Sequence, residues 1–276
     1  MSARPRLAVF KFSSCDGCQL QVLEVLGRAR QHLGGLADIL EVEHFLEARS
    51  RIGVGPYDVG LVEGSVSTPH DVERIKEIRG QCRVLVTIGA CATAGGIQAL
   101  RNWSHVDDFV SAVYATPSYI ETLDKSTPIS DHVKVDFELR GCPIDPGQLG
   151  SVLAAVVIGR KPKLPGYSVC VECKQRGTVC VAVAKGIACL GPVTQAGCGG
   201  LCPAYDRECF GCFGPSQQPN LVSLTGFYER HGAPREQLGH LVQSFNAWAP
   251  EFRAAHDRLA GHPDGHPDGQ AAGDPG

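Results

Sequence analysis

Cysteine is the residue through which this sequence is best able to do chemistry. Thirteen of the 276 residues are cysteines, and eight of these fall between residues 170 and 212, among glycines and prolines. This segment has no sustained helix or strand periodicity and too few apolar residues to offset its chain entropy. We therefore expect cross-links through sulfur to stabilise it, as disulfides, zinc sites or iron–sulfur clusters.

The overall composition narrows these alternatives. The chain has a formal net charge of −3 and no excess of basic residues, so we expect no nucleic-acid partner. Its start has no apolar signal sequence, and its longest apolar run, at 149–159, is too short to cross a bilayer. We expect a cytoplasmic protein without membrane contact, and in that reducing compartment a disulfide framework is disfavoured.

Short β-branched runs alternate with helical patterns through the first 160 residues. This alternation predicts an α/β fold with a mostly parallel, flavodoxin-like sheet. In one predicted helix Thr68 serves as the N-cap and Pro69 takes the first helical position. The predicted strands cover residues 6–12, 38–45, 58–64, 83–90 and 132–139, and the predicted helices cover 19–33, 68–80, 106–114 and 149–159.

Three regions follow from these patterns. We predict a flavodoxin-like domain over residues 1–160 and an irregular, cysteine-rich domain over 161–260. The second domain ends with two helices, at 234–248 and 250–260, each opened by a proline. The Gly- and Pro-rich tail at 261–276 is expected to be disordered.

Four cysteines of the first domain follow predicted strands. Since the carboxyl ends of parallel strands share one edge, where open α/β sheets bind ligands, we expect these thiols to converge. Glu63 follows the third strand at the same edge, where it either touches this site or a subunit interface or is a plain surface carboxylate. Cys82, at the front of the fourth strand, is expected to be a buried structural residue. The four converging residues are Cys15, Cys18, Cys91 and Cys142.

The remaining alternatives concern the bound metal. None of the motifs CDGC, CVEC and CFGC is followed by His, which excludes c-type haem attachment. Twelve cysteines besides Cys82 make three tetrads, which suits zinc or [4Fe–4S] clusters. The Cys-Pro steps at Cys142 and Cys202, and the absence of paired zinc-ribbon knuckles, favour iron–sulfur. A zinc-stabilised interaction module and a thioredoxin-like enzyme using Cys15 and Cys18 remain open.

Several motifs in order resemble a known family. The segments SSCDGCQLQVLE, EGSVS, IGACATAGGIQ, GCP, CLGPVTQAGCGGLCP and CFGC are similar to those of the small, electron-transferring subunit of [NiFe]-hydrogenases. The resemblance runs from about residue 6 to 248 and is closest to the cytoplasmic, NAD(P)-linked type, the delta subunit of sulfhydrogenases.

The resemblance implies three [4Fe–4S] clusters and an electron-conducting role. Electrons from H2 oxidation would pass through them, reversibly, toward an NAD(P)-reducing module. It also implies a [NiFe] centre on the large subunit, and partner subunits with flavin, NAD(P) and ferredoxin-like iron–sulfur sites. We expect no catalytic residue and no nickel site on this chain. The implied ligands are Cys15, Cys18, Cys91 and Cys142 (proximal), Cys170, Cys173, Cys180 and Cys189 (distal), and Cys198, Cys202, Cys209 and Cys212 (medial).

The sequence departs from the family's periplasmic uptake enzymes at two clusters. Cys170 stands where those enzymes have a distal His, and the medial site offers four cysteines instead of three. A fourth thiolate should lower the cluster potential, which suits a nicotinamide acceptor better than a quinone. A deazaflavin or heterodisulfide partner within the same family is the alternative.

Overall fold

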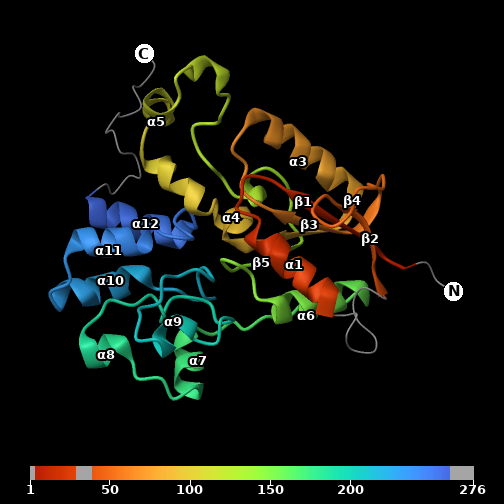
Figure 1. Cartoon of the computed structure of the whole chain (residues 1–276). Helices are drawn as coiled ribbons and strands as arrows, with labels where there is room; N and C mark the ends of the chain where they lie inside the picture. The colour runs from red at the N-terminus through yellow and green to blue at the C-terminus, as the bar shows by residue number, and fades with distance from the viewer. Residues whose placement is uncertain (1–3, 29–38, 262–276) are drawn as a thin grey trace, which may run out of the picture.

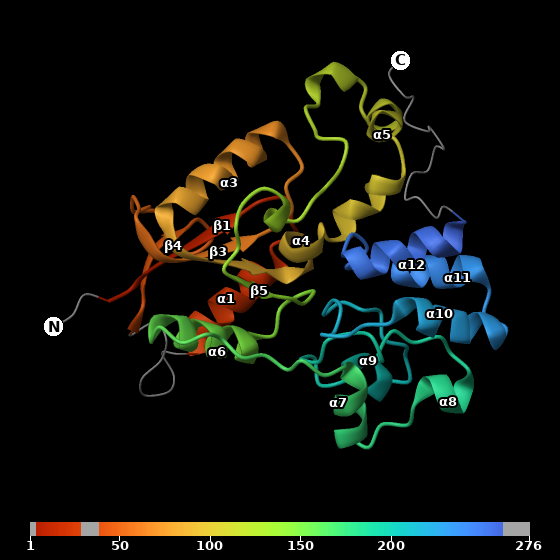
Figure 2. The same ribbon diagram turned by 180° about the vertical axis from the view of Figure 1, so that it is seen from behind.

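The computed structural model describes residues 4–28 and 39–261. The end of the helix predicted at 19–33 and nearly all of the predicted tail therefore lie outside the described residues. Helices and strands within the described ranges are shown from two opposite sides in Figures 1 and 2.

A five-stranded parallel sheet forms the first part of the chain, as predicted. Its strand order is β2-β1-β3-β4-β5, the flavodoxin-like order with a topological switch point between β1 and β3. Helices lie in the connections from β1 to β2, β3 to β4 and β4 to β5, each of which joins neighbouring parallel strands, whereas the connection from β2 to β3 has no helix and passes over β1. The strands are β1 (Arg6–Lys11), β2 (Glu41–Phe45), β3 (Tyr57–Glu63), β4 (Cys82–Ile88) and β5 (Phe137–Leu139).

Helices cover both faces of this sheet (Figure 1). On one face α1 (Gly17–Arg28) and α6 (Pro146–Val157) bury apolar side chains against β1 and β4. On the other face lies α3 (Pro69–Gln81), whose N-terminus is closed by the predicted Thr68 cap and a capping box with Asp71. Burial of apolar surface on both faces is the main stabilising term for such a layered domain.

The chain between β4 and β5 is mostly irregular. After α4 (Gly89–Ala94) and a 3-10 helix η1 (Ile97–Trp103), the predicted helix of the insertion is confirmed as α5 (Val106–Val113). Two further 3-10 turns, η2 (Pro117–Tyr119) and η3 (Ile129–Asp131), lead into β5.

The second part of the chain contains more helix than the sequence predicts. The cysteine-rich segment includes three short helices, and a helix that was not predicted precedes the last two. The helix predicted at 234–248 ends at Val242, and Pro234 is its N-cap instead of its first residue. The helices are α7 (Val169–Gln175), α8 (Val181–Lys185), α9 (Leu201–Ala204), α10 (Leu221–Arg230), α11 (Arg235–Val242) and α12 (Pro250–Ala260).

Polar and aromatic contacts join the two parts. The indole N–H of Trp103 donates to Asp257 on α12 at 3.1 Å, and its ring packs edge-on against Trp248. The Arg140 guanidinium, just after β5, donates to the carbonyl of Pro215 at 3.0 Å. None of the helices in the described part of the chain has the length and apolar character that a bilayer span requires.

Candidate iron–sulfur sites

The first set of cysteines, Cys15, Cys18, Cys91 and Cys142, gathers at the carboxyl edge of the sheet, beside the switch point. Cys15 follows β1, Cys18 lies in the first turn of α1, Cys91 lies in α4, and Cys142 follows β5. Burial, together with repulsion from Cys142 and Cys15, raises the pKa of Cys91 to about 11. Burial likewise raises the pKa of Cys18, and Cys91 and Cys142 add to the shift. The four thiols therefore influence one another's protonation from their places at this edge of the sheet.

Close backbone approach makes room for these thiols. Gly89 has φ +86°, and a Cβ there would lie 2.5 Å from Sγ of Cys18. Gly96 has φ +66°, and a Cβ there would lie 2.5 Å from Sγ of Cys91. Only glycine fits either position, because other residues would be strained and would displace a thiol of the first set.

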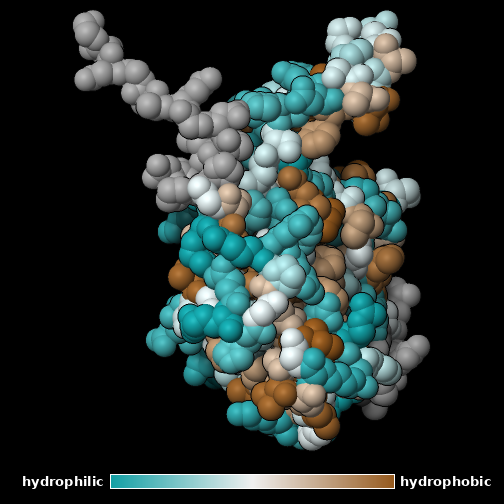
Figure 3. Space-filling model, turned by 90° about the vertical axis from the view of Figure 1, so that its left-hand side faces the viewer, coloured by the Kyte–Doolittle hydropathy of each residue, from teal (hydrophilic) through white to brown (hydrophobic). Residues whose placement is uncertain are grey.

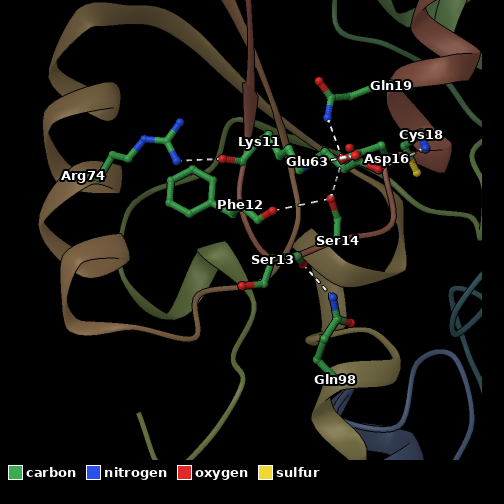
Figure 4. Close-up of polar contacts among 10 residues, drawn as sticks. All are labelled: Lys11, Phe12, Ser13, Ser14, Asp16, Cys18, Gln19, Glu63, Arg74 and Gln98. Carbon is green, nitrogen blue, oxygen red and sulfur yellow. Dashed lines mark hydrogen bonds and ion pairs between the residues drawn. The ribbon is translucent and has the colours of Figure 1, made fainter. Parts of the chain in front are cut away.

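The loop that carries Cys15 is held on three sides (Figure 4). Arg74 of α3 donates to the carbonyl of Lys11 at 2.7 Å, and the amide of Phe12 donates to the carbonyl of Glu63 at 2.7 Å. The Gln98 amide donates to the carbonyl of Ser13 at 2.6 Å. These contacts fix the end of β1 against α3, β3 and η1, so the backbone that leads to Cys15 is held in place.

Gln98 also links Cys91 of α4 to the segment that precedes Cys15. Its side-chain oxygen lies 3.5 Å from Sγ of Cys91, while its side-chain nitrogen bonds the strand end just before Cys15. It stands in the quoted segment IGACATAGGIQ, but nothing in its residue type or spacing singled it out.

Glu63 ends β3 and is only 2% exposed, so it is not a plain surface carboxylate. Its Oε1 accepts the backbone N–H of Cys18 at 3.0 Å, and Gln19 and Ser14 lie beside it (Figure 4). Its Oε2 is buried and has no hydrogen-bond partner among the described residues. Burial raises the pKa of Glu63.

The second set, Cys170, Cys173, Cys180 and Cys189, lies around α7 and α8. A Cβ at Gly191 would lie 3.4 Å from Sγ of both Cys170 and Cys189, so these two thiols flank one point. Burial raises the pKa of Cys173 to about 11, with further contributions from Cys170 and Cys189. Burial also raises the pKa of Cys170, and Cys189 and Cys180 add to that shift.

The third set, Cys198, Cys202, Cys209 and Cys212, lies around α9 and the loop before α10. Burial, together with repulsion from Cys198, Cys142 and Cys202, raises the pKa of Cys212 to about 12. Burial also raises the pKa of Cys202, with Cys198 as the next cause. Cys142 belongs to the first set, so the third set adjoins the first.

Another contact joins the third set to the second. The backbone N–H of Cys209 donates to Sγ of Cys189 at 3.2 Å. Cys198 adds to the electrostatic environment that raises the pKa of Cys173. The third set therefore lies between the first and the second, as Figure 2 illustrates by the central position of α9 between the sheet and α8.

The chemistry of these donor sets fits an iron–sulfur cluster. Buried thiols with raised pKa values keep their protons unless a cation compensates the thiolate, and bound iron supplies that compensation. All thirteen cysteines are free thiols. Across the described ranges, no three Cys, His, Asp or Glu side chains surround a common point as tightly as one metal ion requires.

Two residues near the second and third sets were not predicted from the sequence. The Tyr228 hydroxyl of α10 donates to the carbonyl of Cys189 at 3.0 Å. Glu172 accepts the N–H of Gly200 at 3.2 Å and lies 4.0 Å from Sγ of Cys198. Cys82, by contrast, is the buried structural residue expected, at the start of β4.

Known proteins resemble this chain in sequence. Residues 15–156 match the family model described as NADH ubiquinone oxidoreductase, 20 Kd subunit. The chain is 34% identical to sulfhydrogenase 2 subunit delta of Pyrococcus furiosus, over 88% of this chain and 100% of that protein. It is 30% identical to a vhu subunit of the F420-non-reducing hydrogenase of Methanocaldococcus jannaschii, over 77% of this chain and 83% of that protein.

Solved structures agree with these relatives. A chain of an NAD+-reducing [NiFe]-hydrogenase in its H2-reduced state superposes with a TM-score of 0.53 at 27% identity. That match covers 59% of this chain and 96% of the other. A [NiFeSe]-hydrogenase chain from Dm. baculatum shares the fold, with a TM-score of 0.53 at 16% identity over 82% of this chain and 99% of the other. The chain therefore belongs to the family of [NiFe]-hydrogenase small subunits, the electron-transferring oxidoreductase subunits of these enzymes.

Proposed function

We propose that this chain holds three [4Fe–4S] clusters, with the first set as proximal, the third as medial and the second as distal ligands. The observation that carries the proposal is the spatial order of the three sets, each of four thiols. The electrostatic influence of Cys142 on Cys212 and the hydrogen bond from Cys209 to Cys189 support a continuous row. Bound at these sites, the clusters would supply one-electron relays between the large subunit and an acceptor.

The chain's own residues would set the properties of these sites. Backbone N–H groups stabilise a thiolate, as the amide of Cys209 does for Cys189. Gln98 and Tyr228 hold the backbone that carries Cys15 and Cys189. The chain positions the thiols, excludes water and tunes potentials, and the reaction with H2 takes place on the partner.

The partner at the proximal end is proposed to be the [NiFe] large subunit. Cys15 is exposed at this edge, and exposed apolar side chains accompany it: Leu20 on α1, and Ile97 and Leu100 on η1. An exposed apolar surface beside a buried polar site is typical of a permanent subunit interface.

The proposed acceptor is a flavin- and iron–sulfur-containing module that reduces NAD(P)+. Cys170 in place of a distal His, and a fourth medial cysteine, favour low cluster potentials. One relative is named NAD-reducing hydrogenase HoxS subunit delta, at 31% identity over 39% of this chain. Free thiols throughout are consistent with a cytoplasmic location.

An anaerobic redox titration of the purified complex, followed by EPR, tests this proposal. We expect three [4Fe–4S] signals at low potential, and H2-dependent reduction of NAD+ or NADP+ but not of coenzyme F420. A high-potential [3Fe–4S] signal would refute the medial assignment. Reduction of F420 alone would refute the acceptor, and zinc in place of iron would refute the conducting role.

A further inference from the structure

A turn of two glycines holds the third set of cysteines against the second. Gly199 and Gly200 follow Cys198 and have φ values of +67° and +65°, which turn the chain into α9. A Cβ at Gly200 would lie 3.1 Å from Sγ of Cys173 and 3.2 Å from the backbone nitrogen of that residue. The backbone that leads from Cys198 to Cys202 therefore packs directly on α7, and α7 and α9 are neighbours in both Figure 1 and Figure 2.

Two side chains at the end of α7 bind this turn. Glu172 accepts the backbone N–H of Gly200 at 3.2 Å. Arg176, the C-cap of α7, donates to the carbonyl of Gly199 at 2.9 Å. This N–H and this carbonyl belong to one planar peptide group and point in opposite directions, so a carboxylate and a guanidinium hold the group from both sides.

Glu172 alone of these two side chains also reaches a sulfur of the third set. The oxygen that accepts the N–H of Gly200 lies 4.0 Å from Sγ of Cys198. In the sequence Glu172 stands between Cys170 and Cys173, two members of the second set. A half-buried carboxylate therefore lies where the second and third sets meet, whereas Arg176 is exposed.

We propose that Glu172 is a positioning residue for the third-set cluster and that its negative charge lowers the reduction potential of this cluster. Reduction adds an electron to a cluster that thiolates already make negative, and a carboxylate beside a ligand sulfur disfavours this additional charge. The effect acts through Cys198, since Glu172 lies beside its sulfur. The inference rests on the proposed function, because it concerns one of the three proposed clusters.

The charge of Glu172 can be separated from its hydrogen bond. The side-chain oxygen of a glutamine at this position accepts the same N–H, so Glu172→Gln removes the charge and keeps the contact with Gly200. Solvent screens part of the charge, because Glu172 is only half-buried and the side of the molecule that carries α8, α10 and α11 presents teal, hydrophilic surface interspersed with brown (Figure 3). We therefore expect a change of about tenfold in the ratio of reduced to oxidised cluster at a given potential.

Anaerobic redox titration of the purified complex, followed by EPR, tests the proposal. We expect Glu172→Gln to raise the midpoint potential of the third-set cluster by about 59 mV, the equivalent of a tenfold change for a one-electron couple. Glu172→Asp keeps the charge and should have a potential close to that of the unsubstituted complex. The third-set signal is the one that Cys212→Ala, or Cys202→Ala as a second variant, removes.

Two control variants accompany the titration. Arg176→Gln loses a hydrogen bond to the same peptide group but removes a positive charge, so the third-set potential should not rise. Asp71→Asn removes a half-buried carboxylate on α3 that accepts the N–H of Thr68 at 3.1 Å, and it should leave the third-set potential unchanged.

An unchanged third-set potential in Glu172→Gln would overturn the proposal. An equal rise in Arg176→Gln would overturn it as well, because a loosened turn would then be the cause. Loss of the third-set iron from Glu172→Gln would show a structural role and no electrostatic one. Iron and acid-labile sulfide are measured on the same samples: their absence from the unsubstituted complex would count against the proposed function, whereas their presence with equal potentials would count against the role of Glu172 alone.

Discussion

Replacement of Gly89 by Ala should remove the proximal cluster while leaving the other two in place. Gly89 has φ +86°, and its new Cβ would lie 2.5 Å from Sγ of Cys18. The left-handed backbone costs an alanine about 1–2 kcal/mol. The contact itself is closer than van der Waals packing allows, so the sulfur has to move away from the other thiols of the first set.

Gly159→Ala is the matched control for this change. Gly159 has φ +69°, and a Cβ there would meet no atom within 4 Å. It therefore reports the backbone strain alone, about 1–2 kcal/mol, which lowers Tm by a few degrees. Any loss of iron beyond that of the control belongs to the displaced Cys18 thiol.

Iron analysis and EPR of the anaerobically purified complexes measure the effect. With one four-iron site lost out of three, Gly89→Ala should retain about two-thirds of the iron and lose one EPR signal. Gly159→Ala should retain all of it. If Gly89→Ala binds as much iron as Gly159→Ala does, Cys18 is not a ligand and the assignment of the first set is wrong.

Three further changes test other parts of the account. Cys82→Ala should keep the full iron content and lower the unfolding free energy by about 1 kcal/mol, whereas Cys91→Ala should lose a cluster. Loss of iron from both variants would show that Cys82 is a ligand. Trp103→Phe removes the hydrogen bond to Asp257 and should lower the unfolding free energy by about 1 kcal/mol, measured by thermal denaturation. An unchanged Tm would contradict a role for Trp103 in joining the two parts. In the cluster-free chain, burial raises the pKa of Cys91 to about 11 and that of Cys212 to about 12, above the ordinary value of 9.0, so the folded state binds more protons between these limits. The unfolding free energy of the cluster-free chain, measured with urea, should therefore be constant below about pH 9 and decline above it. The iron-loaded complex should show no such decline, because its ligand thiols have already lost their protons. The same pH profile for both forms would contradict this.

Much of the first domain could be predicted from local pattern. The five strands are short β-branched runs, and Thr68 with Pro69 marks the start of α3 by side-chain chemistry that acts within one turn. The convergence of the first set also followed, because parallel strands expose their carboxyl ends at one edge. These features depend on periodicity and topology, which sequence carries directly.

The second part could be predicted less well, because its elements depend on distant contacts. Helix α10 leaves two of its apolar side chains, Val222 and Phe227, exposed, and Tyr228 fixes it through a hydrogen bond to the carbonyl of Cys189. The short helix α8 is linked by an ion pair from its Lys185 to Asp206, which follows α9. Such contacts leave no periodic signal in the sequence.

The residues that contact the first set could not be predicted individually from the sequence either. Glu63 could be placed at the correct edge, but its burial and its bond to the amide of Cys18 depend on the packing of α1 over β3. Gln98 lies 85 positions from the Ser13 carbonyl that it binds. Long-range pairs of this kind follow from the fold, not from residue type.

The central claim is that twelve thiolates hold three four-iron clusters in a row. The most direct measurement is iron, acid-labile sulfide, nickel and zinc analysis of the complex purified without oxygen and resolved into its subunits. We predict about twelve iron and twelve sulfide per copy of this chain, with nickel only on the large subunit. A chain that carries zinc, or that is free of iron and sulfide, would contradict this claim.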